Sequence, residues 1–110
     1  MAKFLFVAGG SPQPGADEEY SEWYEGTHLP AVLQVDGFVA ATRYRAVPTS
    51  VSTSPYDYVT VYEVEADDAE EAHIRLLAAA KSGALGSSTV VDRERGVSFF
   101  LEPTGPRRTA

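Results

Sequence analysis

The sequence contains no cysteine, and its 110 residues include only two histidines and one methionine. Disulfide bonds, thiolate catalysis and cysteine-bound zinc are therefore excluded. We expect no other metal site, because no carboxylate or third histidine stands at a ligand spacing from either histidine. We also expect no cofactor. A chain without cysteine is typical of the cytoplasm, and we expect that location.

Basic residues are scarce, since 9 Lys and Arg against 16 Asp and Glu give a net charge of −7. Nucleic-acid binding needs clustered Lys and Arg, so we expect no such partner. No apolar run approaches the roughly 18 residues of a membrane span, and no signal-peptide pattern opens the chain. We therefore expect no membrane partner. The length and the 44% hydrophobic content are typical of one globular domain.

The order of elements predicted from the sequence is β-α-β-β-α-β. Apolar and β-branched runs indicate strands near 3–8, 38–47, 56–65 and 96–102, separated by stretches rich in Gly, Pro and Ser. A first helix should start near Asp17 and break or kink near His28, with Pro30 opening a last short turn. A second helix should begin at Asp68, where Glu71 completes a capping box, and end near Ser82.

This order predicts an α+β, ferredoxin-like domain over 1–102, followed by a loose tail over 103–110. Four antiparallel strands would carry both helices on one face. The other face should also be apolar, because side chains of both parities are apolar in the first, third and last strands. We therefore expect a homodimer through the open sheet face, while a monomer with a few exposed apolar residues stays the alternative.

One segment carries a family resemblance. Trp23-Tyr24, His28-Leu29-Pro30 and Gly37-Phe38 follow the pattern W-Y-x-x-x-H-x-P leading into a G-F strand. The segment over 20–45 resembles the EthD-like branch of the dimeric α/β-barrel superfamily. The resemblance implies the dimeric barrel fold, but it is a poor marker of function. The superfamily includes cofactor-independent monooxygenases, polyketide cyclases, decarboxylases, dehydratases and haem-binding proteins. Asp36 stands where many relatives have proline.

His28 is the leading candidate for catalysis, because a histidine at a helix break can act as an acid or base near neutral pH. It follows Tyr24 by four residues and Tyr20 by eight, so all three share one helix face. The topology should bring His73, on the apolar face of the second helix, and Tyr62 towards the same region. We expect His28, Tyr24, His73 and Tyr62 to be catalytic, although His73 taken alone fits a core histidine better.

Aromatic side chains should line a pocket for a flat substrate, or else fill the core. The substrate-binding candidates are Trp23, Tyr20, Phe38, Tyr44, Tyr58 and Phe6. Together with the resemblance, they suggest a cofactor-independent enzyme that acts by proton transfer on a hydrophobic aromatic or polyketide-type small molecule. The reaction would be a cyclisation, dehydration or decarboxylation. A cofactor-free monooxygenase, a non-catalytic ligand-binding or accessory protein, and a haem-ligand role for His28 stay open.

Overall fold

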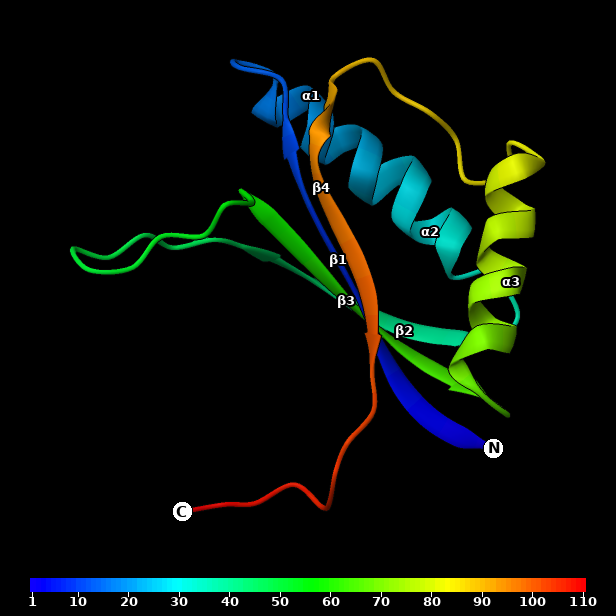
Figure 1. Ribbon diagram of the computed structural model, residues 1–110. Coiled ribbons are helices and arrows are strands. Elements are labelled where there is room, and N and C mark those ends of the chain that lie inside the picture. Colours follow the sequence, from blue (N-terminus) through cyan, green and yellow to red (C-terminus); the bar gives the residue numbers. More distant parts are fainter.

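The computed structural model describes residues 1–110 as one antiparallel sheet with its helices on a single face (Figure 1). The elements in chain order are β1 (Ala2–Pro12), α1 (Asp17–Trp23), the π-helical turn η1 (Tyr24–His28), α2 (Leu29–Val32), β2 (Phe38–Arg45), β3 (Tyr58–Ala66), α3 (Ala69–Lys81) and β4 (Val91–Leu101). The strand order is β2-β3-β1-β4, and all three neighbouring pairs are antiparallel. The predicted ferredoxin-like arrangement is therefore confirmed.

Two strands extend further than the sequence predicts. β1 continues through its glycines to Pro12, and β4 begins at Val91 instead of near residue 96. These extensions pair with each other, with Gly10 opposite Gly96 and Pro12 opposite Val91 across an irregularity in register. Glycine, serine and proline in the extension of β1, and charged residues in that of β4, resemble a loop in the sequence. Cross-strand pairing overrides this weak local preference.

The core lies between the sheet and the helices. Phe4 and Phe6 of β1 alternate onto the covered face and pack beside Tyr62 and Val64 of β3. Phe38 packs edge-on against Phe6, with ring centroids 5.9 Å apart. The remaining buried members of the cluster are Val32, Ala66, Ala72 and Leu85. Burying each large apolar side chain contributes about 1.5–3 kcal/mol.

The second helix starts as the sequence predicts. Asp68 is the N-cap residue of α3, and its side chain accepts a hydrogen bond from the Glu71 N–H at 2.8 Å. This helix and the α1–α2 segment cover one face of the sheet (Figure 1). None of the helices combines the length and the apolar composition that crossing a membrane requires.

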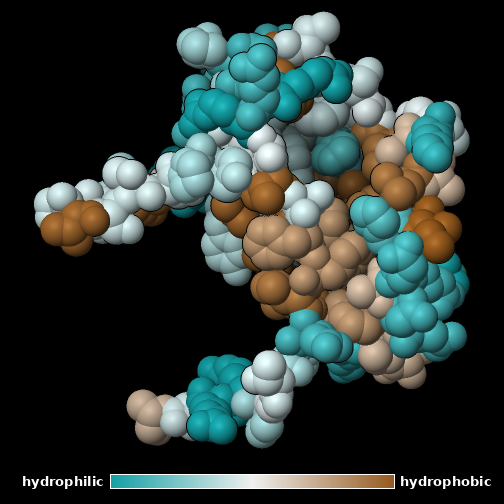
Figure 2. Space-filling model, in the orientation of Figure 1, coloured by the Kyte–Doolittle hydropathy of each residue, from teal (hydrophilic) through white to brown (hydrophobic).

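The opposite face of the sheet carries apolar side chains that no element of the chain covers. Val7 lies between Val61 and Phe99, and the side chains of Phe99 and Tyr44 are 44% and 53% exposed. Figure 2 shows this hydrophobic surface between two projecting segments, the β2–β3 connection over 46–57 and the tail over 103–110.

Gly37, just before β2, occupies a backbone position that other residues avoid. Its φ is +95°, and a Cβ atom there would lie 2.7 Å from the Glu65 carbonyl oxygen. We predict that Gly37→Ala lowers the free energy of unfolding by about 1–3 kcal/mol. Gly105→Ala makes the same chemical change in open space in the tail and should stay within about 0.5 kcal/mol of the unsubstituted protein. Urea titration measures both, and equal effects would contradict this account.

Candidate functional site

The break expected in the first helix is a π turn. The Leu29 N–H bonds to the Tyr24 carbonyl five residues earlier, and the helix then continues into α2. Pro30 has no N–H, so it cannot donate to the carbonyl of Gly26 as a residue of a regular α-helix would. The wider turn accommodates the proline without ending the helix. Such turns occur frequently at functional sites.

This turn places the His28 ring between two aromatic rings. Trp23 stacks on His28 with a centroid separation of 4.9 Å, and Tyr24 meets it at 5.0 Å and a steep angle. In a regular α-helix, residues five apart point about 140° away from each other. Widening the helix by one residue brings Trp23 and His28 to the same side.

One ring nitrogen of His28 is fixed by the backbone. Nδ1 lies 2.9 Å from the Leu85 carbonyl oxygen, and a carbonyl only accepts hydrogen bonds, so Nδ1 carries a hydrogen. Burial lowers the pKa of His28 below its ordinary value, although the bond to Leu85 acts in the opposite direction. The neutral ring therefore presents a lone pair at Nε2. That atom has no partner in the chain and is not sealed from solvent.

The Leu85 carbonyl was not predicted from the sequence. It belongs to the connection between α3 and β4, which packs closely against the π turn. At the adjacent Gly86, φ is +73°, and a Cβ would lie 3.0 Å from Thr27 and 3.6 Å from Trp23 Nε1. A buried leucine directly before glycine in an otherwise polar stretch is the signal that could have indicated this contact.

A cavity of about 370 Å³ opens beside His28. The first helical segment forms one wall, and the paired extensions of β1 and β4 form the other. Its lining comprises Tyr20, Trp23, Tyr24, His28, Ala8, Gly9, Gly10, Val91, Asp92, Arg93, Arg95 and Gly96. The volume suits a small organic molecule, and the aromatic wall suits a flat one.

Tyr20 supplies a second polar group to this cavity. Burial, followed by the neighbouring Tyr24, raises the pKa of Tyr20 to about 12, so its hydroxyl stays protonated. No group of the chain bonds to this hydroxyl, which is not sealed from solvent. A Cβ on Gly10 would lie 2.9 Å from it, so glycine is needed for the strand to pass so close. The hydroxyl can therefore donate a hydrogen bond to a bound molecule.

Tyr24 and Tyr62 bond to each other. Their hydroxyl oxygens are 3.0 Å apart, and Tyr62 is fully buried. Burial, then Tyr24, raises the pKa of Tyr62, so its hydroxyl also stays protonated. Tyr24 contributes to the cavity wall, whereas Tyr62 lies beneath it in the core.

Arg43 lies behind the tyrosines, on the covered face of β2. Its side chain is only 11% exposed. The guanidinium carbon lies 4.2 Å from the centroid of the Tyr58 ring, 5.2 Å from that of Tyr24 and 5.6 Å from that of Tyr20. Contact with the ring faces stabilises the buried cation.

The hydrogen bonds of Arg43 involve only one of its nitrogens. Nη1 donates to Ser21 Oγ at 3.1 Å and to the exposed carboxylate of Glu25 at 2.9 Å. Nε and Nη2 are buried without partners. The positive charge lowers the cost of ionising Tyr20, against the larger effect of burial. The site therefore has a cation beneath its aromatic wall.

The structure does not bring every predicted residue to the cavity. The ring of His73 packs edge-on against Phe100 at 6.0 Å and does not line the cavity that contains His28. Phe6 and Phe38 lie in the core, and Tyr44 lies on the open face of the sheet. Tyr58 packs on Arg43 and donates to Asp17. Of the ten candidates, the cavity lining includes His28, Tyr20, Trp23 and Tyr24.

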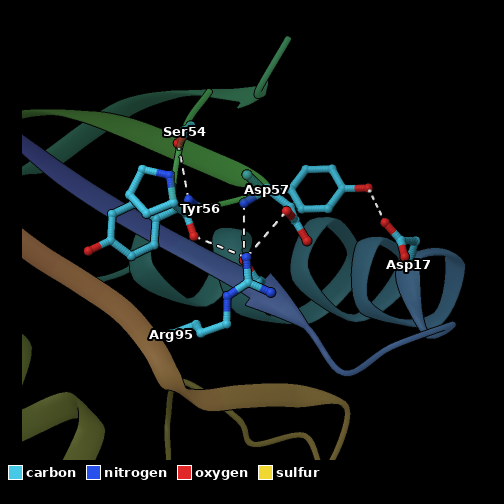
Figure 3. Close-up of polar contacts among 8 residues, drawn as sticks. Asp17, Ser54, Tyr56, Asp57 and Arg95 are labelled. Carbon is cyan, nitrogen blue, oxygen red and sulfur yellow. Dashed lines mark hydrogen bonds and ion pairs between the residues drawn. The ribbon is translucent and has the colours of Figure 1, made fainter. Parts of the chain in front are cut away.

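Arg95, at the rim of the cavity, was not predicted. Figure 3 shows its guanidinium bonded to the Pro55 carbonyl at 3.0 Å and close to the Asp57 carboxylate at 3.6 Å. The Asp57 N–H donates in turn to the buried Ser11 hydroxyl. These bonds hold the β2–β3 connection against β4 beside the cavity. No three His, Asp or Glu side chains gather as metal ligands.

Solved structures with the same architecture include an EthD family protein from Bacillus halodurans C-125. It is 17% identical, with a TM-score of 0.60 over 94% of this chain and 100% of that chain. A dimeric ferredoxin-like protein of unknown function from Jannaschia sp. CCS1 is 10% identical, with a TM-score of 0.59 over 93% and 100%. This chain has the EthD-like, ferredoxin-like fold.

The same architecture occurs in a proposed monooxygenase from Shewanella loihica PV-4. That protein is 11% identical, with a TM-score of 0.64 over 96% of this chain and 97% of that chain. No family model and no curated protein matches the sequence. At these identities the likeness shows the fold alone, and the function has to be argued from the site.

The buried, neutral His28 predicts a pH dependence of stability. The unfolded chain binds a proton at an ordinary histidine pKa of about 6.5, whereas the folded chain resists protonation. The contribution of His28 is therefore fully present above that value and is lost as the pH falls from there through the lower pKa of the folded state. We predict that the stability of the wild-type protein relative to His28→Gln falls between pH 7.5 and 5, as measured by urea unfolding. Parallel profiles for the wild-type protein and His28→Gln would refute the assignment.

Proposed function

We propose that the cavity beside the π turn is the active site of a small cytoplasmic enzyme that needs no cofactor. It would transfer protons on a hydrophobic molecule of aromatic or polyketide type. The observation that carries the proposal is the state of His28, whose Nδ1 is anchored to the Leu85 carbonyl while Nε2 is unpartnered in an aromatic cavity. A neutral imidazole with a fixed tautomer is prepared to act as a base.

The chemistry follows from two of the unpartnered polar groups at the cavity wall, Nε2 of His28 and the hydroxyl of Tyr20. Nε2 of His28 would remove a proton from a carbon next to a carbonyl, and the Tyr20 hydroxyl would donate a hydrogen bond to the resulting oxyanion. In a dehydration the proton would then return from Nε2 to a leaving hydroxyl, which departs as water. In an aldol-type cyclisation the enolate carbon would attack a second carbonyl of the same molecule, and the proton would return to the new alkoxide oxygen. In a decarboxylation His28 would instead take the proton of the carboxylic acid, the bond to the carboxyl carbon would break with release of carbon dioxide, and the proton would return to the enolate carbon. While His28 is protonated, the Leu85 carbonyl accepts the Nδ1–H bond and stabilises the cation.

Tyr24 and Arg43 would assist without touching the transferred proton. The Tyr24 ring packs against the edge of His28, and its hydroxyl is held by Tyr62. The guanidinium of Arg43, on the far side of the tyrosine rings, favours negative charge in the cavity. These residues would hold His28, the base, and Tyr20, the hydrogen-bond donor to the oxyanion, in position.

Cofactor-free monooxygenation is the second candidate, and the Shewanella protein with the same fold favours it. It would use the same first step, in which His28 removes the proton of an electron-rich phenol. The phenolate would supply electrons to O2 and form a peroxide on a ring carbon, and the O–O bond would then break with release of water and leave a quinone oxygen on that carbon. The two functions differ in whether oxygen is consumed.

We also propose that the chain forms a homodimer through the open face of the sheet. The uncovered apolar side chains of β1, β3 and β4 support this arrangement, as does the dimer of the Jannaschia protein with the same fold. A two-fold pair would bury the same surface on each copy.

Replacing His28 tests the catalytic proposal. We predict that His28→Gln lowers turnover by about 100-fold or more in a panel of aromatic ketones and polyketide-type phenols. Binding of the same compounds should change much less, because the cavity keeps its aromatic wall. His73→Gln is the matched control and should retain turnover. Product analysis with and without oxygen separates proton transfer from monooxygenation, and compounds that bind with no turnover would favour a binding protein.

Replacing an exposed side chain on the open face tests the dimer. We predict that sedimentation equilibrium shows a dimer, and that Phe99→Asp raises its dissociation constant by at least about tenfold by burying a charge at the interface. Ile74→Asp places the same charge on α3, where Ile74 is 57% exposed, and should leave association unchanged. A monomeric wild-type protein would refute the proposal.

A further inference from the structure

A second hollow lies on the open face of the sheet, where β1 begins and β4 ends. Its volume is about 570 Å³, and it shares no residue with the cavity at His28. Its lining comprises Lys3, Phe4, Leu5, Val39, Glu63, Val64, Glu65, Leu101, Glu102 and Pro103. We call this hollow the terminal groove.

The terminal groove is acidic as well as apolar. Three carboxylates, Glu63, Glu65 and Glu102, face a single cation, Lys3. None of these four side chains belongs to an ion pair of the chain, whose pairs all lie elsewhere. Leu5 and Leu101 on its floor are partly exposed. An apolar floor with unpaired carboxylates suits a basic segment that also carries apolar groups.

The C-terminal tail over 103–110 has this character. It contains Pro103 and Pro106, followed by Arg107 and Arg108, and all of its side chains are exposed. Its arginines pair with no carboxylate of the chain. The tail leaves the end of β4 and runs away from the sheet (Figure 1). The prolines favour an extended backbone, so Arg108 can lie about 15 Å from Pro103, at roughly 3.1 Å per residue.

We propose that the terminal groove binds the C-terminal tail of a second copy of this chain, with Arg107 and Arg108 against Glu63 and Glu65. This proposal rests on the homodimer through the open face. Each tail starts at Pro103, on the rim of the groove of its own copy. A two-fold axis close to that rim brings the tail of one copy to the groove of the other, and the exchange is reciprocal.

Charge and composition favour this occupant over a tail folded back on its own groove. Folding back would require the tail to reverse direction within the residues that contain both prolines. Crossing to the partner requires no such reversal and pairs two unpaired arginines with two unpaired carboxylates. It also covers part of the apolar floor that the sheet leaves open.

Because the chain contains no cysteine, introduced cysteines report directly on this contact. In the full-length double variant Glu65→Cys/Arg107→Cys, oxidation should give a covalent dimer on a non-reducing gel. A cross-linked monomer would mean that the tail occupies its own groove and would overturn the proposal. The control Glu70→Cys/Arg107→Cys places the first cysteine on an exposed site of α3 and should give no covalent dimer above background.

Charge reversal distinguishes the tail exchange from the homodimer through the open face. Arg107→Glu/Arg108→Glu should weaken dimerisation by about tenfold at low salt, and Glu63→Lys/Glu65→Lys in the same chain should restore it. If Phe99→Asp disrupts the dimer while charge reversal and deletion of 103–110 leave its dissociation constant unchanged, the dimer stands and the tail exchange is wrong. If the wild-type protein is a monomer at all concentrations, both are wrong.

Discussion

The site depends on the missing N–H of Pro30. A regular α-helix through this position would leave the Gly26 carbonyl without a donor and bring it against the proline ring. The π turn over Tyr24–His28 lies directly before this proline, its Leu29 N–H donates to the carbonyl five residues back, and the helix continues beyond it into α2. The same turn stacks Trp23 on His28 and lets the helix continue to the buried Val32. A local backbone constraint thereby determines which side chains face the cavity.

Some polar atoms at the cavity wall have hydrogen-bond partners within the chain, and others have none and remain available to a bound molecule. Nδ1 of His28 is bonded to a backbone carbonyl, and the hydroxyls of Tyr24 and Tyr62 are bonded to each other. At the cavity wall, Nε2 of His28 and the hydroxyl of Tyr20 therefore have no hydrogen-bond partner within the chain. Arg43 adds a cation whose burial is tolerated because three aromatic rings and one carboxylate surround it. A bound molecule would therefore complete the hydrogen bonding of the site.

The sequence predicted what depends on local pattern and missed what depends on contacts distant along the chain. Strand alternation, the Asp68 cap and the disturbance near Pro30 are local, and each is present in the structure. The Leu85 carbonyl is 57 residues from His28, and every residue has such a carbonyl, so the leucine before Gly86 is the one local signal of this contact. His73 lies on the apolar face of its helix, but Phe100 of β4 occupies the space in front of it. Helix periodicity predicts which face of a helix a residue occupies, but it does not predict which element packs against that face.

Successive side chains of a strand point to opposite faces of the sheet, so the cavity at His28 and the open face lie on opposite sides of the same strands. Arg43 and Tyr44 are adjacent on β2, yet one lies under the tyrosines of the first helix and the other is exposed on the opposite side of the sheet. On β1, Phe6 lies in the core and Val7 on the open face. The residues that line the cavity at His28 come from the first helical segment and from the paired ends of β1 and β4. Association would act on the other face, where it could stabilise the sheet that supports the site without changing the groups around His28.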